Sequence, residues 1–267
     1  MATFGFIGTG NMGGALAMAV AKAVGGGNLL LADHSREKAE TLADRLGAKV
    51  GTNADAAAQD FVVLGVKPQM LVGMMAEIAP VLQARTAKGE SFVLVTMAAG
   101  QSMEKIRSLS GTAAPVIRIM PNTPVSIGKG VILYDGMDVK EGQWKDFLAA
   151  FQPAGLLEPL PESLIDAGSA ISGCGPAFVY LFIEALADGG VECGLPRAKA
   201  LQLAAKTLSG AAELVLTSGK HPGQLKDDVC SPGGTTIAGV HALEKGGFRA
   251  LGMDAVKAAY DKTMALK

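Results

Sequence analysis

The chain has 267 residues, of which 49% are apolar and 18% charged, and its formal net charge at pH 7 is -1. This composition is typical of a compact globular protein and excludes a disordered chain, while the balanced charge gives no support to nucleic acid or an acidic membrane as a partner. The three cysteines, Cys174, Cys193 and Cys230, have no metal-ligand spacing and cannot all pair with one another, which predicts a reducing, cytoplasmic location.

The N-terminal residues and the apolar runs predict a soluble protein with neither a signal peptide nor a membrane span. Met1 is followed almost at once by the strand-like Phe4-Gly5-Phe6-Ile7, which leaves no room for a basic region and an apolar signal segment. The longest apolar run, 177–187, contains Glu184 and is followed by Asp188. It is therefore well short of the roughly 20 apolar residues that a membrane span needs.

A glycine-rich turn near the N-terminus predicts a dinucleotide-binding site. Residues 3–8 have the pattern of a buried strand, and the helix of small residues that follows, to about Val24, begins with Gly8-Thr9-Gly10-Asn11-Met12-Gly13. In this motif the first glycine makes a tight turn, the second admits a pyrophosphate, and the third lets helix and strand approach closely. The alternative is a glycine-rich turn without a ligand. A second strand, 28–32, follows at the spacing of a βαβ unit and favours the dinucleotide.

The residues after this second strand bear on the choice between the two nicotinamide cofactors, and their signals conflict. Asp33 could accept hydrogen bonds from a ribose 2′-OH, and its charge would repel a 2′-phosphate. Ser35 and Arg36 could bind that phosphate through a charge-assisted contact of about 1.5–3 kcal/mol. Arg36 is otherwise a surface charge in the first turn of the helix predicted over 36–46. Our hypothesis is that Ser35 and Arg36 outweigh Asp33, so that NADPH is the cofactor and NADH a poorer donor.

Three later strand ends carry further candidate cofactor contacts, because ligands of a doubly wound sheet lie at the carboxyl ends of its strands. The residues that follow these strands, predicted over 61–66, 91–96 and 115–119, are Val66-Lys67-Pro68, Ala98-Ala99-Gly100 and Met120-Pro121-Asn122-Thr123-Pro124. The small Ala98-Ala99 turn leaves space for a flat nicotinamide ring, and the two prolines hold the Asn122 loop rigid. Lys67 is equally well explained as a solvated helix-start residue, and Asn122 as part of a structural turn.

The remaining elements divide the chain into an α/β part and a helical part. Up to residue 160 we expect a strand near 50, helices over 54–58, 69–78, from 102 and over 140–151, and strands over 131–134 and 155–158. Beyond it we expect only helices, over 162–170, 176–192, 196–217, 223–229, 235–244 and 247–267. The prediction is an N-terminal Rossmann doubly wound parallel sheet in residues 1–160, followed by an all-helical domain in residues 161–267. The helix over 196–217 is apolar around much of its circumference, which predicts a subunit interface.

Residues 231–236, Ser-Pro-Gly-Gly-Thr-Thr, open the helix predicted over 235–244. Backbone and hydroxyl donors gathered at the start of a helix can hold an anion. The turn at residues 8–13 already provides for the pyrophosphate, which leaves a substrate carboxylate as the anion for the later loop. The alternative is a capped turn between two helices.

Several motifs, taken together, resemble the pyrroline-5-carboxylate reductase family. They are Ser172-Gly173-Cys174-Gly175-Pro176-Ala177, Ala187-Asp188-Gly189-Gly190, Gly194-Leu195-Pro196-Arg197, residues 221–227 and residues 231–236. The resemblance runs the full length of the chain and implies NAD(P)H-dependent reduction of the cyclic imine 1-pyrroline-5-carboxylate to L-proline, the last step of proline biosynthesis. It also implies a Rossmann domain followed by a helical dimerisation and substrate-binding domain, in homodimers that often assemble into a decamer. Two residues depart from the family pattern: Cys174 stands where Ser is usual, and Asp33 replaces a small polar residue.

By this resemblance, the loop 231–236 binds the substrate carboxylate and ring nitrogen. Our hypothesis assigns the carboxylate to the Ser231 hydroxyl and to the backbone N–H groups of Gly233, Gly234 and Thr235, and the ring nitrogen to the Thr236 hydroxyl. A cyclic imine can enter already protonated, so its reduction needs no conspicuous acid, unlike that of a ketone. We expect no metal, because the sequence has no metal-ligand cluster.

Two other functions compete with this one. A β-hydroxyacid dehydrogenase or another imine reductase has much the same opening motif. Dehydrogenases of that group rely on a Lys in the interdomain helix, where this chain has Ser172-Gly173-Cys174-Gly175-Pro176. A dinucleotide-binding sensor without catalysis would bind the cofactor and show no turnover.

Overall fold

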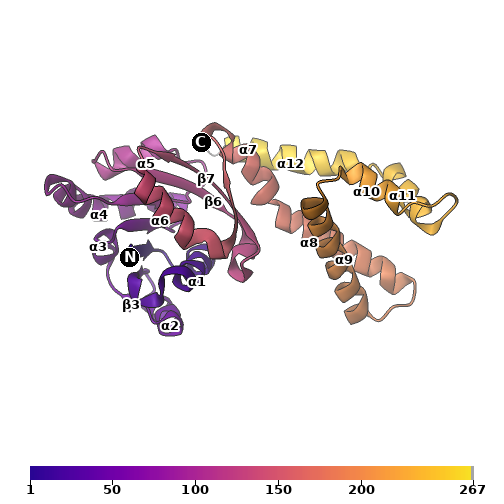
Figure 1. Cartoon of the computed structure of the whole chain (residues 1–267), viewed down its shortest axis with the longest axis horizontal. Helices are drawn as coiled ribbons and strands as arrows, with labels where there is room; N and C mark the ends of the chain where they lie inside the picture. Colours follow the sequence, from indigo (N-terminus) through magenta and orange to yellow (C-terminus); the bar gives the residue numbers. More distant parts are fainter. Residues whose placement is uncertain (266–267) are drawn as a thin grey trace. The chain divides into compact units, whose positions relative to one another are not determined.

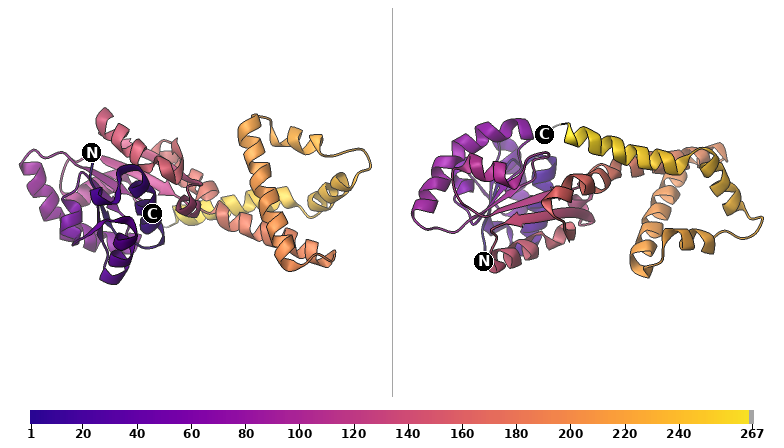
Figure 2. Two further views of the ribbon diagram at one scale, coloured as in Figure 1. Left: turned by 60° about the horizontal axis from the view of Figure 1, so that its bottom comes forward. Right: turned by 90° about the horizontal axis from the view of Figure 1, so that it is seen from above.

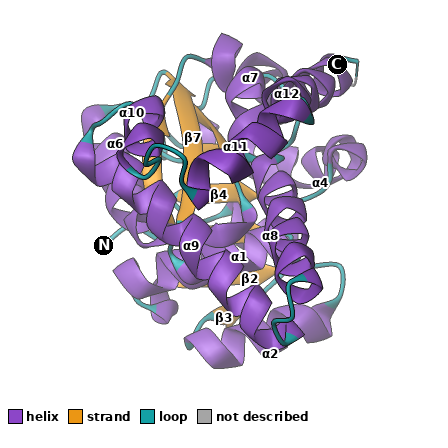
Figure 3. Ribbon diagram, turned by 90° about the vertical axis from the view of Figure 1, so that its right-hand side faces the viewer, coloured by secondary structure: helices purple, strands orange, loops and turns teal. Residues whose placement is uncertain are grey.

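The computed structural model describes residues 1–265, which form two compact units (Figure 1). The first unit comprises residues 1–174 and 259–265, and the second comprises residues 175–258. Strands occur in the first unit, whereas the described residues after 160 form helices and loops (Figure 3). The expected division into an α/β part and a helical part is confirmed.

The first unit is built on one eight-stranded sheet with the order β3-β2-β1-β4-β5-β6-β7-β8. The strands are β1 (Phe4–Ile7), β2 (Leu29–Ala32), β3 (Lys49–Val50), β4 (Phe61–Leu64), β5 (Val93–Thr96), β6 (Val116–Pro121), β7 (Gly130–Met137) and β8 (Gly155–Pro159). Neighbouring strands pair in parallel except β6 and β7, which pair antiparallel. The first six strands have the Rossmann order, whose switch point lies between β1 and β4.

Helices cover both faces of this sheet. They are α1 (Asn11–Val24), α2 (Arg36–Leu46), α3 (Asn53–Ala57), α4 (Pro68–Ala87), α5 (Met103–Ser110), α6 (Glu141–Phe151) and α7 (Glu162–Ser172), with short 3-10 turns at Gly26–Asn28, Thr123–Ile127 and Gln152–Ala154. One buried cluster joins the sheet to α1, α2 and α6, and another joins it to α3, α4 and α5. Both faces of the central strands are therefore buried, which explains their nearly continuous apolar sequence.

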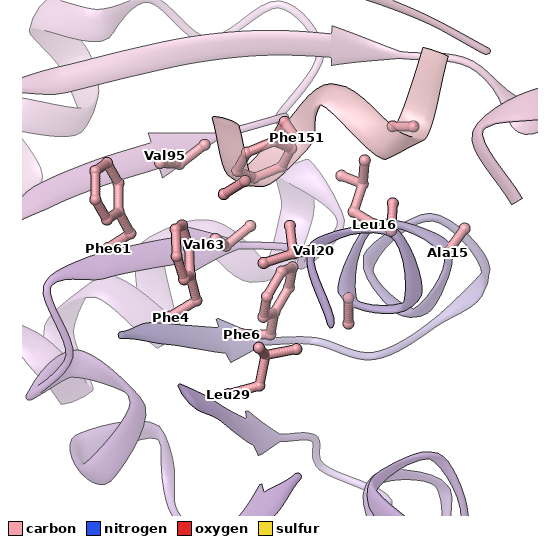
Figure 4. Packing of buried hydrophobic residues seen from close by; sticks show 14 of the residues in the cluster. Phe4, Phe6, Ala15, Leu16, Val20, Leu29, Phe61, Val63, Val95 and Phe151 are labelled. Atoms are coloured by element: carbon pink, nitrogen blue, oxygen red, sulfur yellow. The ribbon is translucent and has the colours of Figure 1, made fainter. Parts of the chain in front are cut away.

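Aromatic residues fill the middle of the first cluster (Figure 4). Phe4 of β1 stacks on Phe61 of β4 with ring centroids 4.8 Å apart, and meets Phe151 of α6 edge-on at 6.3 Å. The side chains of Phe4, Phe6 and Phe151 are fully buried. This packing fixes β1 in the sheet and with it the start of the glycine-rich turn that follows.

Buried polar contacts attach α7 to the sheet of the first unit. Arg118 of β6 is 3% exposed, and its guanidinium Nη2 lies 2.6 Å from Asp166 Oδ1 on α7. Glu162 at the start of α7 accepts a hydrogen bond from the backbone N–H of Met103 at 2.7 Å. The domain limits predicted from the sequence, 1–160 and 161–267, fall before α7, whereas these contacts place α7 with the sheet.

The second unit consists of helices with a small core. They are α8 (Gly175–Glu192), α9 (Arg197–Ser218), α10 (Pro222–Asp228), α11 (Thr235–Lys245) and α12 (Phe248–Met264), the last of which continues into the first unit. The helices α8 and α9 pack together through Ala187, Ala200 and Ala204 (Figure 2). Large apolar side chains on these helices remain exposed in one copy, among them Leu181, Leu203, Leu214 and Leu216.

Three sequence expectations about helices need correction. The helix expected over 69–78 extends to Ala87 and passes through Pro80. Its buried side chains, including Ile78 and Leu82, pack on the sheet and offset the roughly 3 kcal/mol that an internal proline costs.

Within residues 1–265, one helical stretch, Glu162–Glu192, is long and apolar enough to span a membrane, with a window of mean hydropathy 1.6 that is 11% buried. The sequence expectation counted a shorter run because it left out the apolar residues of α7. The helix expected to end at Lys267 ends at Met264 in the described residues, and 266–267 lie outside them.

Candidate active site

The glycine-rich turn joins β1 to α1 at the switch point of the sheet. Gly8 has a φ of +96°, which favours glycine, and a Cβ there would lie 2.7 Å from the Gly65 carbonyl oxygen. A Cβ on Gly13 would lie 2.1 Å from the Gly8 carbonyl oxygen, so helix and strand approach too closely for a side chain. A Cβ on Gly10, in contrast, would have no atom within 4 Å. Gly8 and Gly13 are therefore required by the fold, and Gly10 leaves open space beside the backbone N–H groups that start α1.

Asp33 follows β2 and is held against this turn. Its Oδ2 accepts hydrogen bonds from the Thr9 backbone N–H at 2.7 Å and from the Thr9 hydroxyl at 3.1 Å. Its Oδ1 accepts a hydrogen bond from the Ser35 backbone N–H at 2.9 Å and lies 2.9 Å from Nδ1 of His34. Burial raises the pKa of the Asp33 carboxyl, and the hydrogen bonds from Ser35 and Thr9, with the nearby His34, lower it by more, so that the pKa lies below its ordinary value. The carboxylate is thus ionised and turned into the protein.

Arg36, the first residue of α2, lines a cavity of about 440 Å³, and Ser35, the residue before the helix, lines a separate cavity with Thr9 and Gly10. The side chain of Ser35 makes no capping hydrogen bond to the helix that it precedes. The guanidinium of Arg36 is largely exposed and contacts Glu40 Oε1 at 2.7 Å through its Nε. The cavity beside Arg36 is lined by Ala32, Asp33, His34, Arg36, Ala39, Val50, Gly51, Thr52, Asn53, Asp55 and Glu77. It lies where the adenosine half of a dinucleotide is held in a Rossmann fold.

The other predicted cofactor residues follow the carboxyl ends of β4, β5 and β6, at the same edge of the sheet. Lys67 is the exposed N-cap of α4, with Pro68 in its first turn and Val66 half-buried before it. Ala98 is buried and Ala99 exposed after β5. The topology therefore brings together the strand ends that the sequence singled out, and contact with the cofactor stays a prediction for each of these residues.

Asn122 after β6 has its side chain engaged within the protein. It is 7% exposed, its Nδ2 donates to the Ser172 carbonyl oxygen at 2.9 Å, and its Oδ1 accepts from the Val131 backbone N–H at 2.9 Å. These contacts link the end of β6 to β7 and to the C-terminal turn of α7. Asn122 therefore has a structural role at the edge of the sheet, which is the alternative that the sequence left open. Its contact with the cofactor stays a prediction.

Sequence reasoning overlooked Asn53 at the start of α3. Its Nδ2 donates to Glu77 Oε2 at 2.8 Å, and the residue lines the cavity beside Arg36. The expected helix began at residue 54, which set Asn53 aside as a loop residue. Its place after β3, at the carboxyl end of another parallel strand, is the signal that would have identified it.

The loop 231–236 lies in the second unit, between α10 and α11 (Figure 1). Gly233 has a φ of +67°, and Gly234 is the extended N-cap of α11. The Gly234 backbone N–H donates to the Ser231 carbonyl oxygen at 3.0 Å, and a Cβ on Gly234 would lie 2.5 Å from Ser231 Oγ. Thr235 and Thr236 occupy the exposed first turn of α11, which has no side-chain cap among the described residues. The first-turn N–H groups and hydroxyls are therefore presented at a helix N-terminus.

Side-chain contacts across α10 hold the start of this loop. His221 caps α10 by accepting a hydrogen bond at Nδ1 from the Gly223 backbone N–H at 3.1 Å. At the other end Asp228 accepts from Gln224 Nε2 and Lys220 Nζ, each at 2.9 Å, and these two hydrogen bonds lower the pKa of its carboxyl. In the described part of the chain, no group of three or more His, Cys, Asp or Glu side chains is placed to hold a metal ion.

Comparisons with known proteins place both candidate sites in one family. Residues 162–266 match the family described as pyrroline-5-carboxylate reductase dimerisation, and residues 3–100 match the family described as NADP oxidoreductase, coenzyme F420-dependent. The pyrroline-5-carboxylate reductase of Pisum sativum is 40% identical over 268 residues, which cover 99% of this chain and 96% of the relative. The chain belongs to the pyrroline-5-carboxylate reductase family.

More distant members agree over the same length. The pyrroline-5-carboxylate reductase of Escherichia coli is 36% identical, covering 98% of this chain and 97% of its own length. The pyrroline carboxylate reductase of Plasmodium falciparum, solved with NADP bound, is 33% identical with a TM-score of 0.87, covering 99% of this chain and 97% of that one. The predicted membership of the pyrroline-5-carboxylate reductase family is therefore confirmed.

Proposed function

We propose that this chain reduces 1-pyrroline-5-carboxylate to L-proline, the last step of proline biosynthesis, with NADPH as the hydride donor. The observation that carries the proposal is the match with pyrroline-5-carboxylate reductases over nearly the whole chain, which includes both the glycine-rich turn and the loop 231–236. The chain is accordingly an oxidoreductase acting on a C=N bond.

The glycine-rich turn fits a dinucleotide pyrophosphate. The space beside Gly10 would be filled by a side chain, and the first N–H groups of α1, at Asn11 and Met12, can donate to phosphate oxygens. Ser35 has an uncommitted hydroxyl for a 2′-phosphate, and Arg36 supplies a positive charge beside the cavity. NADPH, when bound, supplies the hydride. We assign the remaining contacts to Val66, Lys67, Ala98 and Ala99 at the neighbouring strand ends.

The loop 231–236 suits a small carboxylate next to a ring nitrogen. We assign the carboxylate to the backbone N–H groups of Gly233 and Thr235 and to the Ser231 hydroxyl, at the positive end of the α11 dipole. Gly234 shapes the turn, because its own N–H already donates to Ser231. The Thr236 hydroxyl, one residue into α11, orients the ring nitrogen.

The imine substrate explains why the loop contains no conspicuous acid. Residues 231–236 include no His, Asp, Glu, Lys, Tyr or Cys that could act as a general acid, whereas reduction of a ketone would call for a general acid. A cyclic imine that enters as an iminium cation becomes neutral when it accepts hydride, so the protein has only to position it. The hydroxyl oxygen of Thr236 can accept a hydrogen bond from the N–H of that cation.

We also propose that the chain acts as a homodimer through α8, α9, α11 and α12, with dimers assembled into a decamer, in the cytoplasm and without a nucleic-acid or membrane partner. The exposed apolar residues of these helices support a second copy as their cover, and so does the dimerisation family that matches residues 162–266. Three free cysteines support a reducing compartment.

The activity is tested by following the oxidation of NADPH at the nicotinamide absorbance, with and without pyrroline-5-carboxylate. We expect oxidation that depends on the substrate and yields proline in equal amount, and a lower kcat/KM with NADH. Cofactor binding without substrate-dependent oxidation would instead identify a dinucleotide-binding sensor.

Replacing Thr236 tests the substrate loop. Thr236→Ala removes the hydroxyl proposed to orient the ring nitrogen, and we expect kcat/KM for pyrroline-5-carboxylate to fall by about 10–100-fold, the loss of one or two hydrogen bonds in the transition state. The Kd for NADPH should stay within about twofold. Thr236→Ser keeps the hydroxyl and is the matched control, for which we expect most of the activity. Equal kinetics for Thr236→Ala and the wild type would remove Thr236 from the site.

A further inference from the structure

We propose that Asp33 positions the glycine-rich turn and does not read the cofactor ribose, so that it supports NADPH and NADH binding alike. An acidic residue after the second Rossmann strand ordinarily binds the ribose 2′-OH of NAD and disfavours a 2′-phosphate. The proposal deepens the proposed function at its cofactor site, since it removes the conflict between Asp33 and the phosphate-binding Ser35 and Arg36.

The acceptor capacity of the Asp33 carboxylate is already used within the protein. An ionised carboxyl group has about four acceptor positions. Oδ2 accepts from the backbone N–H and the hydroxyl of Thr9, at 2.7 and 3.1 Å, and Oδ1 accepts from the Ser35 N–H at 2.9 Å and faces His34 Nδ1 at 2.9 Å. A ribose diol would have to displace some of these contacts to bind the carboxylate in two places.

Burial and charge point the same way. The Asp33 side chain is 5% exposed, whereas the neighbouring His34 side chain is 90% exposed. Burial raises the pKa of the carboxyl, but the hydrogen bonds from Ser35 and Thr9, with the His34 ring beside them, lower it by more, so that these dipoles stabilise the negative charge. A 2′-phosphate near Ser35 and Arg36 therefore meets less repulsion than the sequence suggests.

The contacts connect the two ends of the cofactor site. Thr9 lies between Gly8, with its φ of +96°, and Gly10, and the backbone of a glycine loses more conformational freedom on folding than that of other residues. The Asp33 carboxylate fixes the position of Thr9 through one oxygen and of Ser35 through the other. It thereby orients both the N–H groups that bind the pyrophosphate and the Ser35 hydroxyl that binds the 2′-phosphate. Losing the carboxylate should weaken any dinucleotide that uses the turn.

The test measures Kd for NADPH and for NADH by direct binding to the full chain, without substrate, in wild type, Asp33→Asn and Thr9→Val. Asp33→Asn replaces one acceptor oxygen by a donor, and we expect both Kd values to rise by about tenfold, with their ratio unchanged within about twofold. Thr9→Val removes only the hydroxyl bond, and both Kd values should rise by about threefold. Arg36→Ala checks that selectivity is detectable, because it should weaken NADPH much more than NADH.

Asp60→Asn is the matched control. Asp60 Oδ2 accepts from the Thr3 backbone N–H at 2.9 Å and from the Thr3 hydroxyl at 3.0 Å, the same pair of contacts at the opposite end of β1. We expect no change in either Kd. The proposal is overturned if Asp33→Asn changes the affinity for one cofactor only, if it changes neither, or if Asp60→Asn weakens binding as much.

Because substrate is absent from these measurements, they separate the two proposals. A chain that binds both cofactors as expected but does not reduce pyrroline-5-carboxylate would reject the proposed function and leave the role of Asp33 intact. If Asp33→Asn does not fold, the comparison of Thr9→Val with Asp60→Asn gives the same decision.

Discussion

The two units of the chain bury their apolar residues to very different extents. In the first unit Phe4, Phe6 and Phe151 are fully buried between a sheet and the helices on its face. In the second unit the buried residues are the small Ala187, Ala200 and Ala204, while Leu181 and Leu203 are 66% and 56% exposed. Apolar burial is the main term that offsets the conformational entropy lost on folding.

The difference indicates what each unit needs in order to be stable. The first unit obtains its core from one copy of the chain, and its glycine-rich turn is fixed by that core. The second unit carries the apolar residues of a core without the layer that would cover them, which favours the proposed second copy as that layer. The loop 231–236 is supported by α10 and α11 of this less buried unit, so we expect the substrate site to depend on assembly more than the cofactor site does.

The largest expected effect comes from placing a charge on the exposed apolar residues of the second unit. In a dimer, Leu181→Asp or Leu203→Asp would bury an unpaired carboxylate, at a cost of several kcal/mol, and we expect dimer affinity to fall by at least about 100-fold. Light scattering after gel filtration measures the mass, and NADPH oxidation the activity, which should fall with it. Val72→Asp, on an equally apolar residue of α4 that is 59% exposed, is the control and should leave the mass unchanged. If both second-unit variants remain dimeric, the exposed apolar residues of the second unit do not form the dimer interface.

The two glycine turns offer a smaller and more local contrast. Gly13→Ala brings a Cβ to 2.1 Å from a backbone oxygen that cannot move easily, so we expect the free energy of unfolding to fall by about 1–3 kcal/mol. Gly234→Ala meets the Ser231 hydroxyl oxygen at 2.5 Å, which can rotate away. It should leave Tm nearly unchanged and raise KM for pyrroline-5-carboxylate. Thermal unfolding and steady-state kinetics on both variants check this, and equal destabilisation by the two would show that the loops are equally constrained.

The smallest expected effect concerns acid pH and separates a buried carboxylate from an exposed one. The pKa of Asp33 is lower in the folded chain than its ordinary value of about 3.9, so its contribution to stability is present above pH 4 and is lost as the pH falls through the folded pKa. The stability difference between wild type and Asp33→Asn should therefore shrink as the pH falls below about 4. The pKa of Asp228 is also lowered, but the carboxyl is solvated, so Asp228→Asn should show no measurable difference at any pH. Denaturant titrations at pH 7, 4 and 3 make the comparison.

Local sequence patterns predicted the fold where local interactions determine it. The helix Arg36–Leu46 has the predicted bounds, because Ser35 is extended before it and Gly47, with a φ of 66°, ends it in the left-handed conformation. The end of α4 was predicted wrongly, since Pro80 is a local stop signal that the packing of Ile78 and Leu82 overrides. The doubly wound sheet followed from the alternation of strands and helices and is confirmed, with one antiparallel pair between β6 and β7.

The candidate site was predictable in its location and less so in its contacts. Placing the cofactor residues at strand ends needed only the Rossmann pattern. The partners of Asn122, Ser172 and Val131, lie in other elements, and no spacing rule relates Asn122 to a backbone oxygen 50 residues away. For the same reason the sequence left Asp33 as a possible partner of the ribose 2′-OH, whereas its hydrogen bonds go to Thr9 and Ser35.

The path of the chain between the two units has a consequence for how the protein is made. The chain leaves the first unit after Cys174 and returns to it at Ala259, so that the whole second unit is inserted in the first. During synthesis from the N-terminus, the sheet and its covering helices emerge well before the residues of α12 that belong to the same unit. Because no described residue of α12 is buried and neither apolar cluster of the sheet includes one, the core of the α/β unit can form before the inserted helical unit has been made.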